Sequence, residues 1–196
     1  MIKLILENNL KGLVLEILKG EGPVRIVASG VSMYPFIRKG DIMVLDPFIP
    51  EDNAETGEFR RPDRRMEFGV GDPVLTKNDS HRWLIHRVIK IEKEEQTGRI
   101  ITKGDALSKA DLPVRPDQVW GKITRVERGD SERKYDLGKP VRRGFDYLLA
   151  LLSRMEMGLF SVCRALSPGF SEQRFFPVIR KIIKLPRWLL IKIFFP

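Results

Sequence analysis

The sequence predicts a mainly β protein, in which a β-rich domain is flanked by an N-terminal amphipathic helix and a helical, basic C-terminal region. Between residues 23 and 130, short apolar segments follow one another closely, and each is bounded by Gly, Asp or Pro. Residues 1–22 carry apolar side chains at helical spacing, whereas residues 131–196 combine apolar segments with many basic side chains. We therefore divide the chain into these three regions.

The first twenty residues form the expected N-terminal helix. Charged residues interrupt their apolar side chains, unlike the uninterrupted apolar segment of a secretory signal or a membrane-spanning helix. We expect neither of those, and instead a helix that packs on the protein. Its apolar face would carry Leu10, Leu13, Val14, Ile17 and Leu18.

Six strands are predicted in the β-rich domain. Two Gly-Asp pairs, Gly40-Asp41 and Gly71-Asp72, mark turns that introduce the second and third strands. Residues 50–69 are polar, charged and contain two prolines, which predicts a surface loop or insertion. The strands are expected at 24–28, 42–49, 73–77, 82–94, 99–105 and 118–128, with a hairpin at 94–98 joining the fourth and fifth.

The C-terminal region carries most of the net charge. Residues 141–196 hold ten Lys/Arg and three Asp/Glu, a net +7 out of +9 for the whole chain. We expect a helix over 141–166, then a basic segment rich in aromatic residues that lies in the interface of an anionic membrane. The alternative is a helix packed on the β domain with its charged side in water. Nucleic acid is not expected, because the basic residues follow no known binding module.

Cysteine and histidine are scarce. The single cysteine, Cys163, excludes an internal disulfide, and with only two histidines the chain has too few ligands for a Cys/His zinc site. We therefore predict no metal site and no cofactor.

Candidate catalytic residues each have an ordinary structural explanation when considered alone. Ser32 follows a predicted strand and precedes a turn, where serine is common. His86 lies in a predicted strand, where a histidine is more often a hydrogen-bonded structural residue, and His81 lies in a polar turn. Asp105 would form a turn after a glycine, and Asp111 would be a solvated loop acid.

The order of these residues resembles that of the signal peptidase I-like family of serine peptidases, in the branch found in archaea and the endoplasmic reticulum. The matching motifs are "SGVSMYPFIRKGD", "GVGDPVLTK", "IHRVIKI", "TKGDALSKAD" and "VWGKITRV", which span residues 27–126. The resemblance implies a β-rich catalytic domain like that of signal peptidases and the LexA-like self-cleaving repressors.

The resemblance also implies catalytic roles. Ser32 would be the nucleophile and His86 the base. In the other branch of the family, found in bacteria, a lysine is the base. Asp111 matches the acid that orients the base, and Asp105 would be structural, although both carboxylates are candidates. The Ser32 backbone N–H would stabilise the oxyanion, and Gly30 stands where many members carry a second hydroxyl donor.

The predicted function is a serine endopeptidase that cleaves a peptide or precursor protein, associated with a membrane surface through its C-terminal region. A cytoplasmic location is the alternative. A second hypothesis is a non-catalytic protein that binds a peptide or a protein partner on the same fold. A regulator akin to the self-cleaving repressors ranks last, because it needs a lysine base and a DNA-binding unit longer than residues 1–20.

Overall fold

A computed structural model describes residues 22–48, 51–52, 59–60, 68–79, 82–92, 98–128, 133–137, 140–166, 185–186 and 188–192 of the 196. The predicted N-terminal helix lies outside these residues, as do most of the predicted 50–69 loop and most of the segment after residue 166. The description below concerns the β-rich domain and the helix that follows it.

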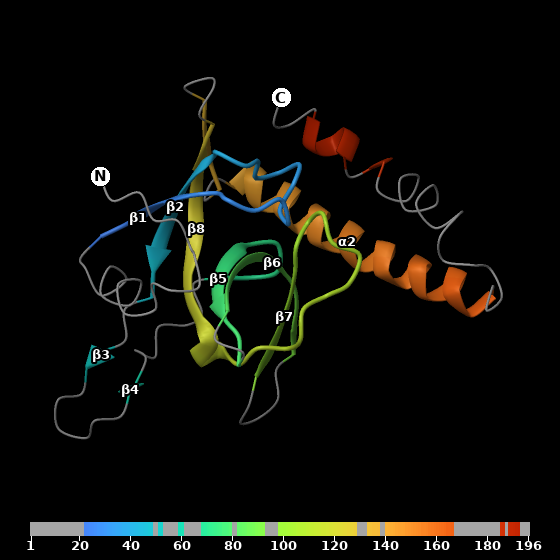
Figure 1. Cartoon of the computed structure of the whole chain (residues 1–196), viewed down its shortest axis with the longest axis horizontal. Coiled ribbons are helices and arrows are strands. Elements are labelled where there is room, and N and C mark those ends of the chain that lie inside the picture. Colours follow the sequence, from blue (N-terminus) through green and yellow to red (C-terminus); the bar gives the residue numbers. More distant parts are fainter. Residues whose placement is uncertain are drawn as a thin grey trace.

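One antiparallel sheet of seven strands forms the body of the protein (Figure 1). The strand order is β1-β2-β8-β5-β6-β7, and β9 pairs with β8. The prediction of a mainly β protein is thus confirmed. The strands are β1 (Val24–Val27), β2 (Ile42–Pro47), β5 (Pro73–Lys77), β6 (Trp83–Glu92), β7 (Arg99–Lys103), β8 (Val119–Glu127) and β9 (Lys134–Asp136), and a separate pair joins β3 (Glu51–Asp52) to β4 (Phe59–Arg60).

The six predicted strands agree with six of these, and β6 and β7 form the predicted hairpin. β9 was not predicted, and it extends the sheet past residue 130 into the region expected to be helical. Its three residues are too few to show an alternating pattern in the sequence. The helix expected over 141–166 is α2 (Pro140–Leu166).

Both Gly-Asp pairs form the same turn. Gly40 and Gly71 have φ angles of 92° and 106°, a backbone conformation that residues with a Cβ rarely adopt. The aspartate after each glycine accepts a hydrogen bond from the backbone three residues before it, at 2.8 Å for Arg38 N to Asp41 and 2.9 Å for Gly69 N to Asp72. The two turns therefore have the same hydrogen bond, and one directly precedes β2 and the other β5.

Apolar side chains pack on both faces of the sheet. Neighbouring residues Val74 and Leu75 of β5 point to opposite faces, and they belong to different buried clusters. The larger cluster joins Leu75 to side chains from β1, β2, β8 and α2, and the smaller one joins Val74 to side chains from β6, β7 and β8. The sheet is therefore covered on both sides at its centre.

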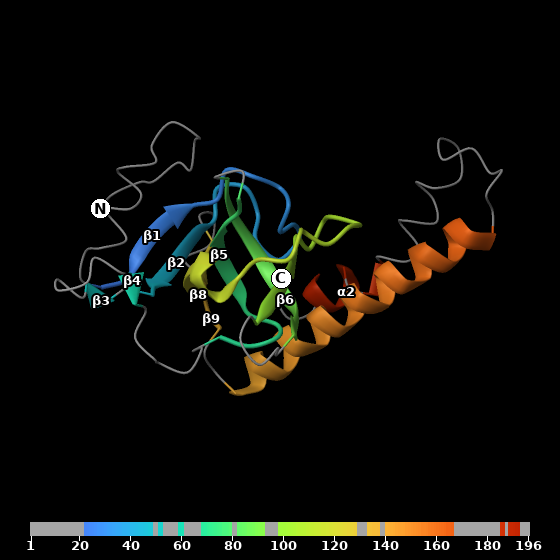
Figure 2. The same ribbon diagram turned by 90° about the horizontal axis from the view of Figure 1, so that it is seen from below.

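Helix α2 packs against the sheet and then continues beyond it (Figure 2). Phe145 and Leu149 join the larger cluster, and both are buried. The helix backbone also touches the turn before β5, because a Cβ added to Gly71 would lie 2.7 Å from Asp146 C and Tyr147 N. Within the described part of the chain, no helix is long and apolar enough to cross a membrane.

The contact between Gly71 and α2 predicts the effect of two matched substitutions. Gly40→Ala and Gly71→Ala both force an alanine into a positive φ, which costs about 1–2 kcal/mol. Only Gly71→Ala also forces a methyl group into the α2 backbone, since no atom lies within 4 Å of the position at Gly40. We expect Gly71→Ala to lower the free energy of unfolding by about 1–3 kcal/mol more than Gly40→Ala does, as measured by urea denaturation. Equal losses would show that α2 does not pack on this turn.

Candidate functional site

Ser32 lies in the loop between β1 and β2, on a turn anchored by buried apolar residues. Met33, Phe36 and Ile37 are between 0% and 5% exposed, whereas Val31 just before the serine is 65% exposed. The backbone N–H of Ile37 donates to the Met33 carbonyl at 2.9 Å, which closes the turn. The turn is thus fixed to the core on one side of Ser32 and open to solvent on the other.

His86 lies in β6 and is 3% exposed. Its Nδ1 lies 2.6 Å from Asp111 Oδ2, and the Thr102 hydroxyl donates to the same oxygen at 2.7 Å. The backbone N–H of Asp111 donates to the Thr102 carbonyl at 2.8 Å. Asp111 is thereby held against the ring by the neighbouring strand β7 as well as by its own loop.

Gly104 lies where the Ser32 turn and the His86 ring meet. A Cβ added to Gly104 would lie 2.7 Å from the Ser32 carbonyl oxygen and 3.0 Å from His86 Nε2. The Ser32 carbonyl also accepts a hydrogen bond from the Ala106 backbone N–H at 2.7 Å. The nitrogen that does not face Asp111 therefore lies beside the segment that carries Ser32.

Ser32 and His86 both line a pocket of about 200 Å³. The end of β1, the Ser32 turn and the first half of β6 form its walls, and most of the lining side chains are apolar. Such a pocket can hold an apolar side chain of a ligand next to the serine and the histidine. The other lining residues are Val27, Ala28, Ser29, Gly30, Met33, Ile37, Met43, Trp83, Leu84 and Ile85.

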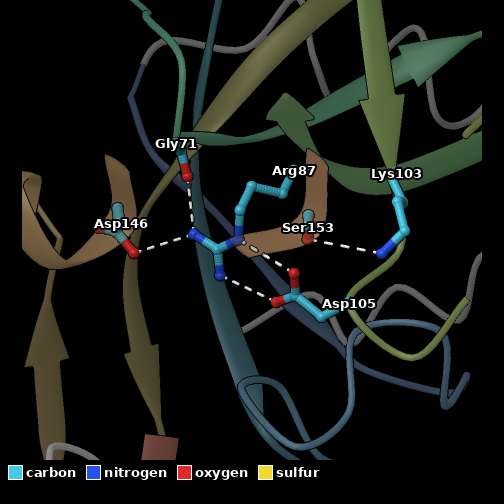
Figure 3. Close-up of polar contacts among 6 residues, drawn as sticks. All are labelled: Gly71, Arg87, Lys103, Asp105, Asp146 and Ser153. Atoms are coloured by element: carbon cyan, nitrogen blue, oxygen red, sulfur yellow. Dashed lines mark hydrogen bonds and ion pairs between the residues drawn. The ribbon is translucent and has the colours of Figure 1, made fainter. Parts of the chain in front are cut away.

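Asp105, the other candidate carboxylate, pairs with Arg87 (Figure 3). The Arg87 guanidinium donates to the two Asp105 oxygens at 3.1 and 2.9 Å. Its Nη1 also donates to Asp146 of α2 at 2.9 Å and to the Gly71 carbonyl at 2.7 Å. The guanidinium stacks on the Phe36 ring, 4.5 Å from its centroid, and is fully buried.

A second buried cation, Lys103 of β7, also faces α2. Its Nζ lies 3.4 Å from Ser153 Oγ (Figure 3). The same Nζ lies 3.5 Å from a Glu156 carboxylate oxygen. Arg87 and Lys103 are register partners on β6 and β7. Because side chains alternate along a strand, these two cations lie on one face, and His86 and Thr102 lie on the other.

Burial and charge shape the titration of this cluster. Burial alone would lower the pKa of Arg87, but the charges of Asp105 and Asp146 and their hydrogen bonds outweigh it and raise that pKa. Burial raises the pKa of Asp146 to about 6, and Asp72 and Asp105 add to this effect while Arg87 opposes it. The raised pKa keeps Arg87 charged at neutral pH, whereas the pKa of Asp146, at about 6, lies near neutrality.

Sequence reasoning assigned no role to Arg87, Thr102 or Asp146. Arg87 and Thr102 lie inside the quoted motifs. Arg87 directly follows His86, and Thr102 lies three residues before Asp105, so their positions in the sequence could have indicated a role at the site. Asp146 gave none, because 59 residues separate it from Arg87. His81 lies outside the described residues. Among the residues that the structure describes, no group of three His, Cys, Asp or Glu side chains could hold a metal ion.

Comparison with known proteins finds a similarity to a signal peptidase subunit, in agreement with the family that the sequence motifs resemble. Over 102 residues, the chain is 32% identical to the signal peptidase complex catalytic subunit sec11 of Schizosaccharomyces pombe. The similarity covers 50% of this chain and 53% of that protein, so the chain spans about half the length of the curated relative that it matches. No family model and no solved structure matches the chain. The similarity supports a signal peptidase I-like family and nothing finer.

The raised pKa of Asp146 predicts how stability depends on pH. Between the ordinary pKa of 3.8 and about 6, the native protein keeps a proton that the unfolded chain has lost. The stability from this proton is present below about pH 4 and is lost as the pH rises through 6, a change of about 3 kcal/mol for about two pKa units. Asp146→Asn keeps the acceptor for Arg87 and removes the titration.

Urea denaturation of the wild type and Asp146→Asn at about pH 4 and pH 7 measures this change. We expect the stability of the wild type relative to the variant to fall by roughly 2 kcal/mol between the two pH values, most of the full effect. The comparison cancels the titration of all other groups. Parallel pH profiles for the two proteins would contradict the assignment.

Proposed function

We propose that this protein is a serine endopeptidase of the signal peptidase I-like type, with Ser32 as nucleophile, His86 as base and Asp111 as the residue that orients the base. The proposal rests mainly on the two ring nitrogens of His86. One lies 2.6 Å from Asp111, and the other lies beside the Ser32 turn at Gly104. A histidine that is held by a carboxylate at one ring nitrogen and shares a pocket with a serine at the other supports a base that activates a hydroxyl nucleophile.

The proposed reaction has two steps. His86 Nε2 takes the Ser32 hydroxyl proton while Oγ attacks the carbonyl carbon of the substrate, and the carboxylate of Asp111 stabilises the imidazolium. The imidazolium then protonates the leaving amine, and the C–N bond breaks to leave an acyl group on Ser32. A water molecule, deprotonated by His86, hydrolyses this ester and restores the hydroxyl. Asp105 has no part in these transfers, because it pairs with Arg87.

The proposed substrate is an extended segment of a peptide or precursor protein. Among the described strands, β1 lies at one edge of the seven-stranded sheet, and the residues that follow it line the pocket beside Ser32. An extended peptide that lies along this edge can place an apolar side chain in the pocket and its carbonyl at the serine. The chain's similarity to a signal peptidase complex catalytic subunit supports a precursor protein as the source of this segment.

The alternative function is peptide or partner binding without catalysis. Gly30 favours it, because many signal peptidase-like enzymes carry a hydroxyl donor to the oxyanion at this position. A pocket of about 200 Å³ would still bind a peptide side chain without that donor. The two functions differ in whether Ser32 is reactive.

A serine-directed acylating probe distinguishes them without knowledge of the substrate. We expect the probe to label the wild type on Ser32, as located by mass spectrometry of peptides, and to leave Ser32→Ala unlabelled. His86→Ala is expected to react at least a hundredfold more slowly, because general-base catalysis contributes factors of about 10²–10⁴. Circular dichroism checks that the variants are folded. A folded wild type that does not react would support the binding protein instead.

A substitution at Gly30 extends the same assay. No atom lies within 4 Å of an added Cβ there, so alanine and serine both fit. We expect Gly30→Ser to be acylated roughly tenfold faster or more, because its hydroxyl supplies a second oxyanion donor. Gly30→Ala, the matched control, is expected to react like the wild type. Equal rates for the serine and alanine variants would place position 30 outside the oxyanion site.

A further inference from the structure

Helix α2 has two faces of opposite character. Its inner face packs against the sheet and carries the only two acids of the helix, Asp146 and Glu156, which are 1% and 5% exposed. Those acids face the buried cations Arg87 and Lys103. The outer face of α2 therefore presents no negative charge.

Six large apolar side chains lie on the outer face of α2. At about 100° per residue they fall within an arc of roughly 120°, on the side of the helix away from the buried acids. Leu151 is 41% exposed, Met155 63% and Leu159 49%, so these side chains are not packed against the rest of the protein. We call this set the apolar stripe of α2: Tyr147, Leu148, Leu151, Met155, Leu159 and Val162.

Exposed arginines flank the apolar stripe. Arg143 and Arg154 are both exposed and fall next to Tyr147 on the helical wheel, along one edge of the stripe. The short helical segment 188–192 adds the same kind of surface, because Leu189 is 53% exposed and Lys192 is exposed while Ile191 is buried in the core. Apolar and basic side chains thus share the surface of both helical segments.

The length and position of α2 leave this surface accessible. The helix has 27 residues, and Figures 1 and 2 both show its C-terminal part extending past the edge of the sheet. The apolar stripe continues into this part, since Leu159 and Val162 belong to it. A flat partner can therefore contact the stripe along the helix without meeting the β sheet.

We propose that the apolar stripe of α2 and its flanking arginines form a docking surface for an anionic lipid bilayer, with the helix lying in the plane of the interface. The stripe would enter the boundary between headgroups and acyl chains, and Arg143 and Arg154 would contact lipid phosphates. A second copy of the chain is a poorer partner, because two identical outer faces would bring arginines together with no acid of α2 between them. The surface does not depend on the chemistry at Ser32.

Co-sedimentation of the full chain with lipid vesicles tests this surface. The vesicles contain phosphatidylcholine alone or phosphatidylcholine with phosphatidylglycerol. We expect the wild type to bind the anionic vesicles, and Leu151→Gln/Met155→Gln to bind them at least roughly tenfold more weakly because it loses two inserted side chains. Arg143→Gln/Arg154→Gln is expected to weaken binding by a similar factor, and added salt should weaken the binding of the wild type.

Two controls make the result specific. Leu112→Gln removes a leucine that is 86% exposed but lies outside α2, and it should bind like the wild type. Ser32→Ala should also bind like the wild type, so that a failure of the proposed peptidase function leaves this test intact. Circular dichroism checks that each variant is folded, as expected for changes at exposed positions.

Other outcomes would overturn the proposal. Unchanged vesicle binding in both α2 double variants would mean that another part of the chain carries the affinity. Equal binding to neutral and anionic vesicles would contradict the role of the arginines. A dimer in solution that Leu151→Gln/Met155→Gln dissociates would assign the stripe to a second copy instead.

A fluorescent label gives a second readout of insertion. The label is attached to Leu151→Cys in a Cys163→Ser background, so that it reports on the centre of the apolar stripe. We expect its emission to shift to shorter wavelength when anionic vesicles are added, and the same label at Leu112→Cys to show no shift. No shift at position 151 would contradict insertion of the stripe.

Discussion

The buried guanidinium of Arg87 is the interaction on which the arrangement of the site depends. Its partners come from three separate segments, namely Asp105 after β7, Gly71 before β5 and Asp146 in α2. Because strand side chains alternate, a shift of β6 by one residue would turn Arg87 toward Asp111 and His86 toward α2. That shift would bury an unpaired cation and leave two carboxylates without their partner, which is strongly unfavourable. The ionic cluster therefore fixes the face on which His86 lies.

The same cluster connects the two surfaces to which functions are proposed. Asp105 and Asp111 lie in one short segment, so the pairing of Asp105 with Arg87 fixes one end of the loop that brings Asp111 to His86. Asp146 fixes α2 to the opposite face of the same hairpin. Since the acids of α2 are used for this inner contact, its outer face is left apolar and basic. One set of buried charges thus determines both the alignment of the histidine and the character of the proposed membrane surface.

Much of the sheet could be predicted from the sequence, because its signals are local. The positive-φ glycines before Asp41 and Asp72 mark turns, and alternating apolar residues mark the strands between them. Two features could not be predicted in this way. β9 is too short for a pattern, and the contact between Asp146 and Arg87 joins segments that only the packing of α2 brings together. At the site, the resemblance favoured Asp111 as the orienting acid but kept Asp105 as a candidate, and the structure places Asp111 against the His86 ring and Asp105 against the Arg87 guanidinium.

The central claim is that His86 keeps its proton on Nδ1, donates it in a hydrogen bond to Asp111, and leaves Nε2 free of a proton so that it can accept the proton of Ser32. The most direct test is the nitrogen NMR spectrum of the protein labelled with ¹⁵N-histidine, recorded at about pH 8, above the ordinary titration range of imidazole. The chain has two histidines, so a His81→Gln variant assigns the signals. The account predicts the tautomer protonated at Nδ1 in the wild type, with a changed Nδ1 signal in Asp111→Asn. A His86 ring protonated at Nε2 in the wild type would contradict it.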